Sequence, residues 1–340
     1  MNKITVVGID LGKSVFHVHG VDAAGLTVIE RRFTRKALHI WLARLEPCLI
    51  GMETCSGAHH LGRWLRQQGH EVRLMNPRYV KPYVKTNKND ARDAEAICEA
   101  VTRPQMRFVS IKSVAQQEVQ MMHRVRSRIV AERTALANQV RGFLREFGIT
   151  VGEGIRVLRR LLPQILEDGC NELSSSGRSL LWQLREELVL LDERVELMDG
   201  RLRAQAQDDE RCRRLQSVPG IGPLTATALV SAIGDVHSFG SGRHLAAWLG
   251  LVPKQHSTGG KPRLLGISKR GDRYLRTLLI HGARAALRGA MQRDDRCSRW
   301  VMALEKRRGR NVAIVALANK MARMVWAMWT TQQDYRPACA

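Results

Sequence analysis

The first hundred residues contain short apolar segments that alternate between the two-residue period of strands and the longer period of helices. An apolar run from Ile4 to Ile9 ends at Asp10, and the segment from Val15 to Val21 alternates as a paired strand does. The turn from Asp22 to Gly25 leads to a third such segment, Leu26 to Phe33. The pattern therefore predicts three strands joined by hairpins.

Helical and extended patterns then follow one another. Helices are predicted for Lys36 to Leu45 and His59 to Gln68, and strands for Leu49 to Glu53 and Glu71 to Met75, before the break at Asn76-Pro77. Three hairpin-linked strands followed by alternating helices and strands is the order of a ribonuclease-H-like fold. We expect an α/β domain at the N-terminus.

Two long segments with helical periodicity come next, from Val114 to about Phe147 and from about Ser179 to Gln207. Charges between residues 111 and 207 are nearly balanced, with 15 Lys and Arg against 13 Asp and Glu. The pattern fits an antiparallel helical pair or coiled coil, and it fits an ordinary helical bundle about as well. The stretch from Gly169 to Gly177 is expected to be a loop. The second segment has apolar residues three and four apart: Leu184, Leu188, Leu191, Val195, Met198 and Leu202.

Helical patterns resume after residue 208 and extend to about Trp329. The expected organisation is an α/β domain over residues 1–110, a helical or coiled-coil linker over 111–207, a mostly helical domain over 208–330 and a polar tail over 331–340. The 340 residues are enough for two or three domains, each with its own core.

The charge of the chain points to a polyanionic partner. There are 55 Lys and Arg against 32 Asp and Glu, a net charge of +23, although the hydrophobic content of 44% is ordinary. From Lys254 to Arg310 the count is 16 Lys and Arg against 4 Asp and Glu. We therefore expect the main phosphate-binding surface in the C-terminal third.

A membrane surface is the competing partner for such a charge. No apolar run approaches the length of a spanning helix and the N-terminus lacks a signal peptide, so nucleic acid is the expected partner. The seven cysteines are scattered, odd in number and never in a C-x-x-C pair, which argues against disulfides and for a reducing cytoplasm.

Four carboxylates are candidates for metal binding. Asp10 and Glu53 end apolar strands, and Asp90 and Asp93 lie three apart on a predicted helix, so they share one face. Each acid alone is better explained as a solvated side chain, or Asp90 as a helix N-cap. Together they favour a divalent-metal site, because like charges on one face repel unless a cation neutralises them and hard cations take oxygen ligands. Two magnesium ions at such a site can activate a nucleophile and stabilise a leaving oxygen.

A glycine-containing turn, V-P-G-I-G (Val218 to Gly222), lies between predicted helices. It resembles the helix-hairpin-helix motif, in which glycines such as Gly220 and Gly222 expose backbone amides to a phosphate at a helix N-terminus. A tight interhelical turn without a ligand is the alternative.

The segment from Pro253 to Arg276 combines hydroxyl, glycine and basic residues. Gly259 and Gly260 permit close approach of the backbone to a ligand. Ser257 or Thr258 can act as a nucleophile if its proton is removed. The alternative is a flexible basic loop that contacts DNA without covalent chemistry. The residues expected to bind phosphates are Lys261, Arg263, Lys269, Arg270, Arg273 and Arg276.

Several motifs, in this order along the chain, resemble those of the DEDD-type transposases of bacterial insertion sequences. They are G-I-D, G-M-E, K-N-D-A-R-D-A-E-A-I, P-G-I-G, G-L-V-P, H-S-T-G-G-K and G-I-S-K-R-G-D. The similarity covers nearly the whole chain. It is to insertion-sequence family 110, 1111-like subgroup, whose relatives include the pilin-gene invertase and the bridge-RNA-guided recombinases.

The resemblance implies a RuvC-like N-terminal domain, a coiled-coil linker and a C-terminal transposase domain. It also implies that Asp10, Glu53, Asp90 and Asp93 bind magnesium, and that Ser257 is the nucleophile of a phosphoserine intermediate. Aligning by the glycines instead puts Thr258 in the place of the serine. The implied partners are donor and target DNA, a structured guide RNA encoded by the element, and further copies of the chain, as a dimer or tetramer with composite active sites. The implied location is the bacterial cytoplasm, with the nucleoid.

Three other functions compete with this interpretation. A Holliday-junction nuclease of RuvC type would use the four acids to activate water and leave Ser257 without a role. An actin-like kinase also begins with G-I-D-L-G, but the sequence lacks its second phosphate-binding turn. An architectural DNA-binding protein would use only the hairpin and the basic segment, and would leave the acids unexplained.

Overall fold

The computed structural model of the chain describes residues 3–85 and 89–337. The chain folds into two compact units. Unit 1 comprises the chain up to Gln116 together with Ile233–Ser238, and unit 2 comprises Gln117–Ala232 and the chain from Phe239 onwards. Lys88, the first residue of the K-N-D motif, and the last three residues of the tail lie outside the described part.

Unit 1 is built on a mixed six-stranded sheet in the order β3-β2-β1-β4-β5-β6. The first three strands pair antiparallel, β4 and β5 run parallel to β1, and the short β6 is antiparallel to β5. The five strands predicted from the sequence are confirmed, and they follow one another along the chain in the predicted order, three hairpin-linked strands first and two strands alternating with helices after them. The strands are β1 (Val6–Leu11), β2 (Val15–Val21), β3 (Thr27–Thr34), β4 (Leu49–Glu53), β5 (Glu71–Met75) and β6 (Phe108–Val109).

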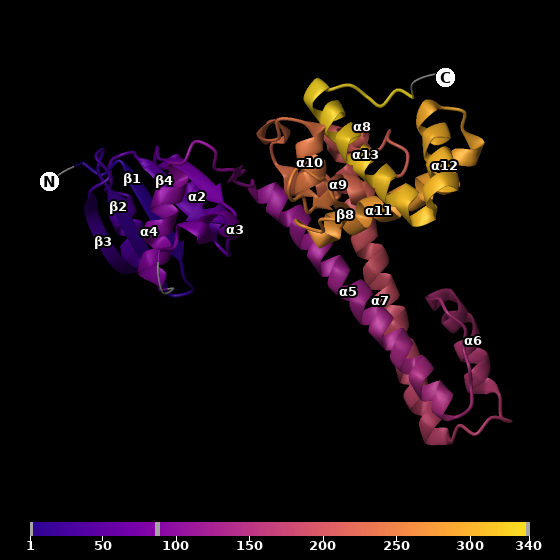
Figure 1. Cartoon of the computed structure of the whole chain (residues 1–340). Helices are drawn as coiled ribbons and strands as arrows, with labels where there is room; N and C mark the ends of the chain where they lie inside the picture. Colours follow the sequence, from indigo (N-terminus) through magenta and orange to yellow (C-terminus); the bar gives the residue numbers. More distant parts are fainter. Residues whose placement is uncertain (1–2, 86–88, 338–340) are drawn as a thin grey trace. The chain divides into compact units, whose positions relative to one another are not determined.

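Helices cover both faces of this sheet (Figure 1). On one face, α1 and α2 pack against inward-pointing residues such as Val7 and Ile9. On the other, α4 packs against β1, β2 and β4. The helical elements of this unit are α1 (Arg35–Leu42), α2 (Ala58–Gln67), α3 (Pro77–Val80), η1 (Lys81–Tyr83), α4 (Asp90–Val101) and η2 (Val236–Ser238).

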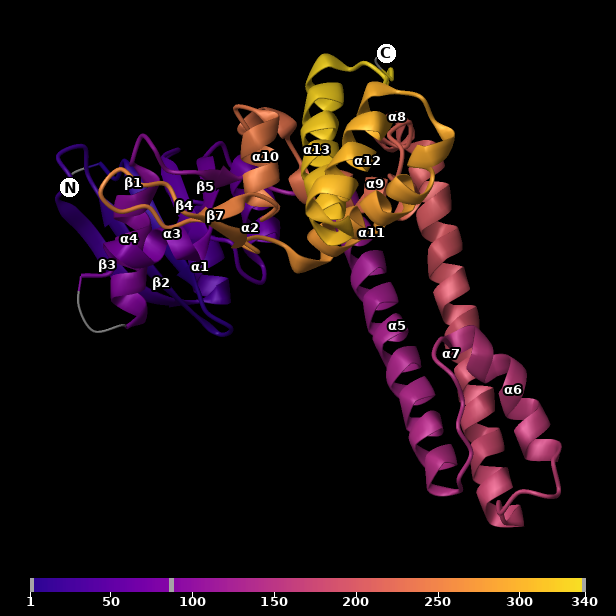
Figure 2. The same cartoon turned by 45° about the vertical axis from the view of Figure 1, so that its right-hand side comes forward.

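Nearly all of the predicted long helical pair, α5 (Val114–Glu146) and α7 (Ser175–Asp208), belongs to unit 2, and the two helices lie side by side in Figures 1 and 2. Arg126 forms an ion pair with Asp199, and Arg133 pairs with Asp192 at 3.0 Å. Since the residue number rises along α5 as it falls along α7, the two helices are antiparallel.

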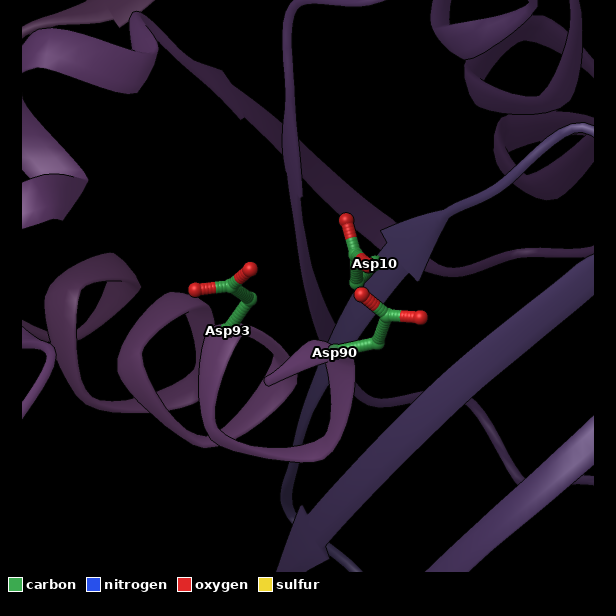
Figure 3. Close-up of side chains that lie close together, drawn as sticks. All are labelled: Asp10, Asp90 and Asp93. Atoms are coloured by element: carbon green, nitrogen blue, oxygen red, sulfur yellow. The ribbon is translucent and has the colours of Figure 1, made fainter. Parts of the chain in front are cut away.

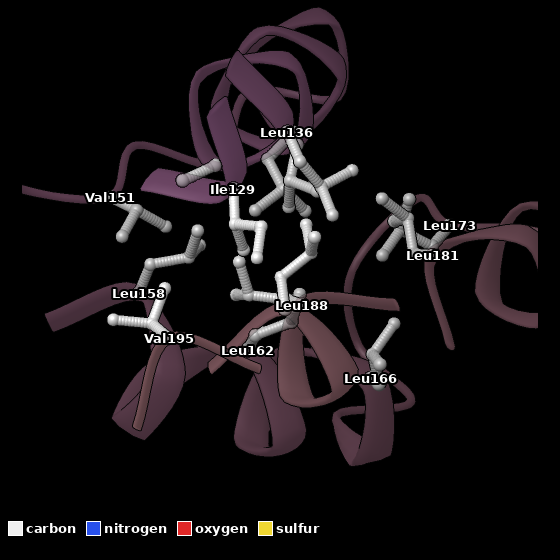
Figure 4. Close-up of a cluster of buried hydrophobic side chains, with 14 of the residues drawn as sticks. Ile129, Leu136, Val151, Leu158, Leu162, Leu166, Leu173, Leu181, Leu188 and Val195 are labelled. Atoms are coloured by element: carbon white, nitrogen blue, oxygen red, sulfur yellow. The ribbon is translucent and has the colours of Figure 1, made fainter. Parts of the chain in front are cut away.

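A third helix, α6 (Ile155–Glu167), was not predicted. It joins the pair in one apolar core, in which Leu158 and Leu162 lie against leucines of α5 and α7 (Figure 4). The pair is therefore a short bundle along this part of its length. The predicted loop from Gly169 to Gly177 is shorter than expected, because Ser174 caps α7 and its first turn begins at Ser175.

The remainder of unit 2 is mostly helical, as expected, with one small hairpin between α10 and α11. Its elements are α8 (Glu210–Leu215), α9 (Pro223–Ile233), α10 (Gly242–Trp248), β7 (Pro253–Gln255), β8 (Leu264–Ile267), α11 (Arg273–Arg288), η3 (Ala290–Gln292), α12 (Arg296–Arg308) and α13 (Arg310–Thr331).

Helix α13 corrects one expectation from the sequence. It has 22 residues and a mean hydropathy of 1.2 in its most apolar part, so by length and composition it is one helix of the described residues that could cross a membrane. Its apolar residues, among them Leu317, Met321 and Val325, are buried against α10, α11 and α12. The apolar composition of α13 is therefore explained by its place in the core of unit 2.

Candidate functional site

Three of the four predicted acids converge in unit 1. Asp10 lies near the end of β1, and Asp90 and Asp93 lie in the first turn of α4 (Figure 3). One carboxylate oxygen from each lies within 4.8 Å of the others. Asp90 is exposed and the other two are half-buried, so the cluster is open to solvent.

A glycine two residues before each strand-end acid explains how α4 comes so close to the sheet. A Cβ at Gly8 would lie 2.2 Å from the Ala94 carbonyl oxygen, and a Cβ at Gly51 would lie 2.8 Å from the Val101 Cβ. Because residues i and i+2 of a strand point to the same face, Asp10 faces α4 as Gly8 does. The glycine of G-I-D thus brings Asp10 toward the first turn of the helix.

The start of α4 is capped by Asn89 and not by Asp90. The Asn89 side chain accepts a hydrogen bond from the Arg92 backbone N–H at 2.9 Å. The Asp90 carboxylate is therefore not used as a cap, which was the structural alternative to metal binding. The positive end of the helix dipole stabilises acids in this first turn.

Glu53 lies at the end of β4, beside β1, but outside the close group of three carboxylates. Parallel pairing of Ile9 with Met52 places Glu53 at the strand end adjacent to that of Asp10. Burial raises the pKa of the Cys55 thiol, and the Asp10 and Glu53 carboxylates raise it further. Both acids are therefore close enough to Cys55 to act on the same thiol.

His17 is a residue near this cluster that the sequence did not single out. It lies opposite Asp10 in the antiparallel pairing of β1 and β2, and its Nε2 is 3.6 Å from Asp90 Oδ2. The alternation of β2 puts His17 and His19 on the face that α4 covers. That alternation was visible in the sequence, but the proximity to Asp90 depends on the packing of α4.

The donor set suits a hard divalent cation. Three closely spaced carboxylates repel one another, and a cation that binds their oxygens removes that repulsion. Among the described residues, Asp10, Asp90 and Asp93 are the group that offers such a set within one small space. Magnesium fits these ligands better than a soft metal would.

Ser257 belongs to unit 2, in the hairpin between β7 and β8. It is exposed, and its Oγ accepts a hydrogen bond from Gln255 Nε2 at 2.8 Å. Thr258 and Lys261 pair across the tip, and the two glycines between them both have positive φ, 56° and 73°. Two such residues form the turn that matches the twist of a tight hairpin. The glycines therefore shape the turn and leave its backbone open.

The basic residues of this segment differ in exposure. Arg276 is 8% exposed, and its guanidinium donates to the backbone carbonyls of Leu249 and Arg270 at 3.1 and 3.3 Å. It therefore stabilises the chain around α11 and is not part of the exposed basic surface. The other five predicted phosphate ligands are exposed: Lys261, Arg263, Lys269, Arg270 and Arg273.

The V-P-G-I-G turn lies between α8 and α9, as expected. Gly220 has a φ of 91°, and a Cβ there would lie 2.4 Å from the Gly282 carbonyl oxygen of α11. Gly220 is thus required for close packing of the turn on α11. A Cβ at Gly222 would meet nothing within 4 Å, so the N-terminal end of α9 is open beside that residue.

Comparisons with known proteins identify relatives of both parts of the chain. Residues 212–296 match a family described as "Transposase IS116/IS110/IS902 family", and residues 7–149 match a transposase family named for the DEDD transposase of IS110. A "Probable family 20 transposase" of Pseudomonas aeruginosa is 50% identical over 98% of this chain and 99% of its own length.

Two further relatives have names that refer to insertion sequences. The "Transposase for insertion sequence element IS1111A" of Coxiella burnetii is 45% identical, over 99% of this chain and 92% of the relative. The "Transposase for insertion sequence element IS1328" of Yersinia enterocolitica is 43% identical, over 97% of this chain and 98% of the relative.

Proposed function

The chain belongs to the IS116/IS110/IS902 family of transposases, enzymes that cut and rejoin DNA, and we propose that it does so by metal-assisted phosphoryl transfer through a phosphoserine. The observation that carries the proposal is the convergence of Asp10, Asp90 and Asp93 in a chain of net charge +23. The convergence supplies a place for metal, and the charge supplies attraction to a nucleic acid.

In this proposal Asp10, Asp90 and Asp93 hold magnesium, with Glu53 at the adjacent strand end as the fourth acid of the set. Magnesium held by these acids, as two ions in this proposal, would supply positive charge that lowers the cost of phosphoryl transfer. The first turn of α4 supplies both Asp90 and Asp93, so the two carboxylates lie on the same side of the helix.

The proposed nucleophile is Ser257. Its Oγ forms a bond to the phosphorus, the P–O bond to one deoxyribose oxygen breaks, and that oxygen leaves as a hydroxyl after taking up a proton. The serine proton passes to a base or to solvent. Rejoining reverses these changes with a different deoxyribose hydroxyl, so the bond energy is kept and no ATP is needed. Lys261 and Arg263, both exposed on the same hairpin, are suited to stabilise the charge on the phosphorus oxygens.

Two other parts of unit 2 are proposed to position DNA. The turn from Val218 to Gly222 acts as a helix-hairpin-helix, with the open end of α9 at Gly222 directed to a phosphate. Lys269, Arg270 and Arg273 add exposed cations before and at the start of α11.

The proposal also includes a guide RNA, an oligomeric state and a division into domains. We base these three on the resemblance to the family. Residues 1–110 are proposed as a RuvC-like catalytic domain, 111–207 as a linker, 208–330 as a transposase domain and 331–340 as a tail. Carboxylates of one copy would act with Ser257 of another in a dimer or tetramer. An element-encoded RNA would pair with donor and target DNA, in the nucleoid of the bacterial host.

Trapping on a suicide DNA substrate tests the nucleophile. Wild-type protein is expected to yield a protein–DNA adduct that survives denaturation, and Ser257→Ala is expected to abolish the adduct while DNA binding is kept. Thr258→Ala is the matched control, since it removes the adjacent hydroxyl. If Thr258→Ala abolishes the adduct and Ser257→Ala does not, the nucleophile is Thr258.

The RuvC-type nuclease is the second candidate, because the same acids can activate water. It predicts strand cleavage without any protein–DNA bond. If both Ser257→Ala and Thr258→Ala still cleave DNA and no adduct forms, the chain acts as such a nuclease and not as a recombinase.

A further inference from the structure

The solvent-facing side of α11 carries a continuous polar and cationic stripe. Spacings of three and four residues put the members of the stripe on one side of the helix. Leu275, Leu279 and Ala283, on the opposite side, are buried in the core of unit 2. The members are Arg273, Thr277, His281, Arg284 and Arg288, and all five are exposed.

Some charges of α11 interact unfavourably in the free protein, although Asp272 caps its N-terminus and Arg288 lies in its last turn, where a cation is favourable. Helix α11 contains no Asp or Glu, so it lacks the i,i+4 ion pairs that stabilise exposed helices. Arg284 and Arg288 are like charges at i,i+4, and Arg273 lies at the positive end of the helix dipole. None of the ion pairs within residues 3–85 and 89–337 involves Arg273, Arg284 or Arg288. A bound polyanion would remove each of these unfavourable interactions.

The stripe has the length and the order of side chains that suit duplex DNA. From Arg273 to Arg288 it extends about 22 Å at 1.5 Å per residue. Arginines occupy its two ends, whereas the centre holds Thr277 and His281, which form hydrogen bonds without a permanent charge. A helix in the major groove has this arrangement, because its centre faces base edges while its ends pass near the two phosphate backbones.

We propose that the exposed face of α11 contacts duplex DNA, with Thr277 and His281 in the major groove and Arg273, Arg284 and Arg288 on phosphates. A-form RNA is a poorer fit, because its major groove is too deep and narrow for a helix to enter. The proposal rests on the proposed function only for its DNA substrate, and it is independent of the metal and of Ser257.

The test compares two double variants that lose the same net charge. Arg284→Gln with Arg288→Gln removes two charges from the stripe. Arg145→Gln with Arg160→Gln removes two exposed arginines from α5 and α6 of the same unit. Binding to a duplex DNA is measured by fluorescence anisotropy against salt concentration, in EDTA and in a Ser257→Ala background. Thermal unfolding of each variant checks that it is folded.

Loss of two phosphate contacts is expected to lower the slope of log K against log salt by about 1.8 in the stripe variant, at about 0.9 per phosphate. The control variant is expected to keep the wild-type slope. Equal changes in both variants, or none in the stripe variant, would overturn the proposal. Because no cleavage occurs in this assay, failure of the phosphoserine mechanism would leave its outcome unaffected.

Two further measurements are made. One compares binding to DNA with binding to RNA, and the other compares the role of the arginines at the ends of the stripe with that of the two residues at its centre. A loss confined to duplex or single-stranded RNA would overturn the DNA assignment. Thr277→Ala with His281→Ala is expected to weaken DNA binding while the salt slope stays close to that of the wild type, since all three arginines of the stripe are kept. A lowered slope in that variant would contradict the placement of the arginines on the phosphates.

Discussion

His123 is a buried histidine of unit 2 with a partner on each ring nitrogen. Its Nδ1 lies 2.9 Å from Tyr274 Oη and its Nε2 lies 3.0 Å from Thr227 Oγ1. The pKa of His123 is lowered to about 4, chiefly by burial and also by the positive charge of Arg126, whereas Asp199 opposes the shift. The folded protein therefore holds this imidazole neutral.

This shift predicts a loss of stability in acid. Between pH 6.5 and about 4 the unfolded chain binds a proton at His123 that the folded chain does not, so the free energy of unfolding falls as pH falls. The fall approaches about 1.4 kcal/mol per pH unit within this window. Denaturant unfolding at several pH values measures it. His123→Gln should reduce this pH dependence, and His60→Gln, a change of an exposed histidine, should not. Equal pH dependence in wild type and His123→Gln would contradict the assignment.

Single residues were predictable from the sequence where their chemistry and their position in a strand or helix were enough. The convergence of Asp10, Asp90 and Asp93 followed from one strand end and one helix face. The burial of Arg276 was not predictable, because a basic residue in a basic segment has the same pattern whether it binds backbone carbonyls or a phosphate. His17 was missed since its distance from Asp90 depends on the packing of α4 on the sheet.

At the scale of elements, the contact between the Val218–Gly222 turn and α11 depends on two facing glycines. A Cβ at Gly282 would lie 2.1 Å from the Gly220 carbonyl oxygen, and that oxygen belongs to backbone that cannot rotate away. The glycine in the middle of α11 is thus explained by close packing, although glycine lowers helix stability by about 1 kcal/mol relative to alanine.

Gly282→Ala is therefore expected to destabilise the protein by roughly 1 to 3 kcal/mol despite the better helix propensity of alanine. Gly222→Ala serves as the control, since its Cβ would meet nothing within 4 Å. Thermal or denaturant unfolding of both variants measures the difference. Stability equal to or above that of the wild type in Gly282→Ala would show that the turn and α11 are not packed this closely.

Elements with a strong local pattern were predicted well, and elements that depend on distant contacts were not. Strands β4 and β5 match their predicted bounds because apolar runs and breaks define them. Helix α6 was missed since it is short and contains Pro163, and its leucines are buried only against the α5–α7 pair. No strand pairing was predicted for the segment that forms the β7–β8 hairpin, although its two glycines make a tight turn.

At the scale of the whole molecule, the sequence indicated the order of an α/β part followed by helical parts. It did not show that Ile233–Ser238, far along the chain, belongs to the first unit. A Cβ at Gly234 would lie 3.1 Å from the Ser110 Cβ, a contact between segments with no shared pattern. The carboxylates and Ser257 belong to different units, and we propose that both act in one reaction.

The most direct test of that claim is the dependence of the covalent protein–DNA adduct on the carboxylate site. Adduct yield on a suicide substrate is measured for wild type with magnesium, for wild type with EDTA, and for Asp90→Asn. Glu30→Gln, an exposed acid of the same unit, is the control. Asp90→Asn keeps the shape of the side chain and removes one of three repelling charges, so its thermal stability should equal or exceed that of the wild type. An adduct is expected only for wild type and Glu30→Gln with magnesium; an adduct of wild-type yield in EDTA or in Asp90→Asn would show that the carboxylates and Ser257 do not act in one reaction.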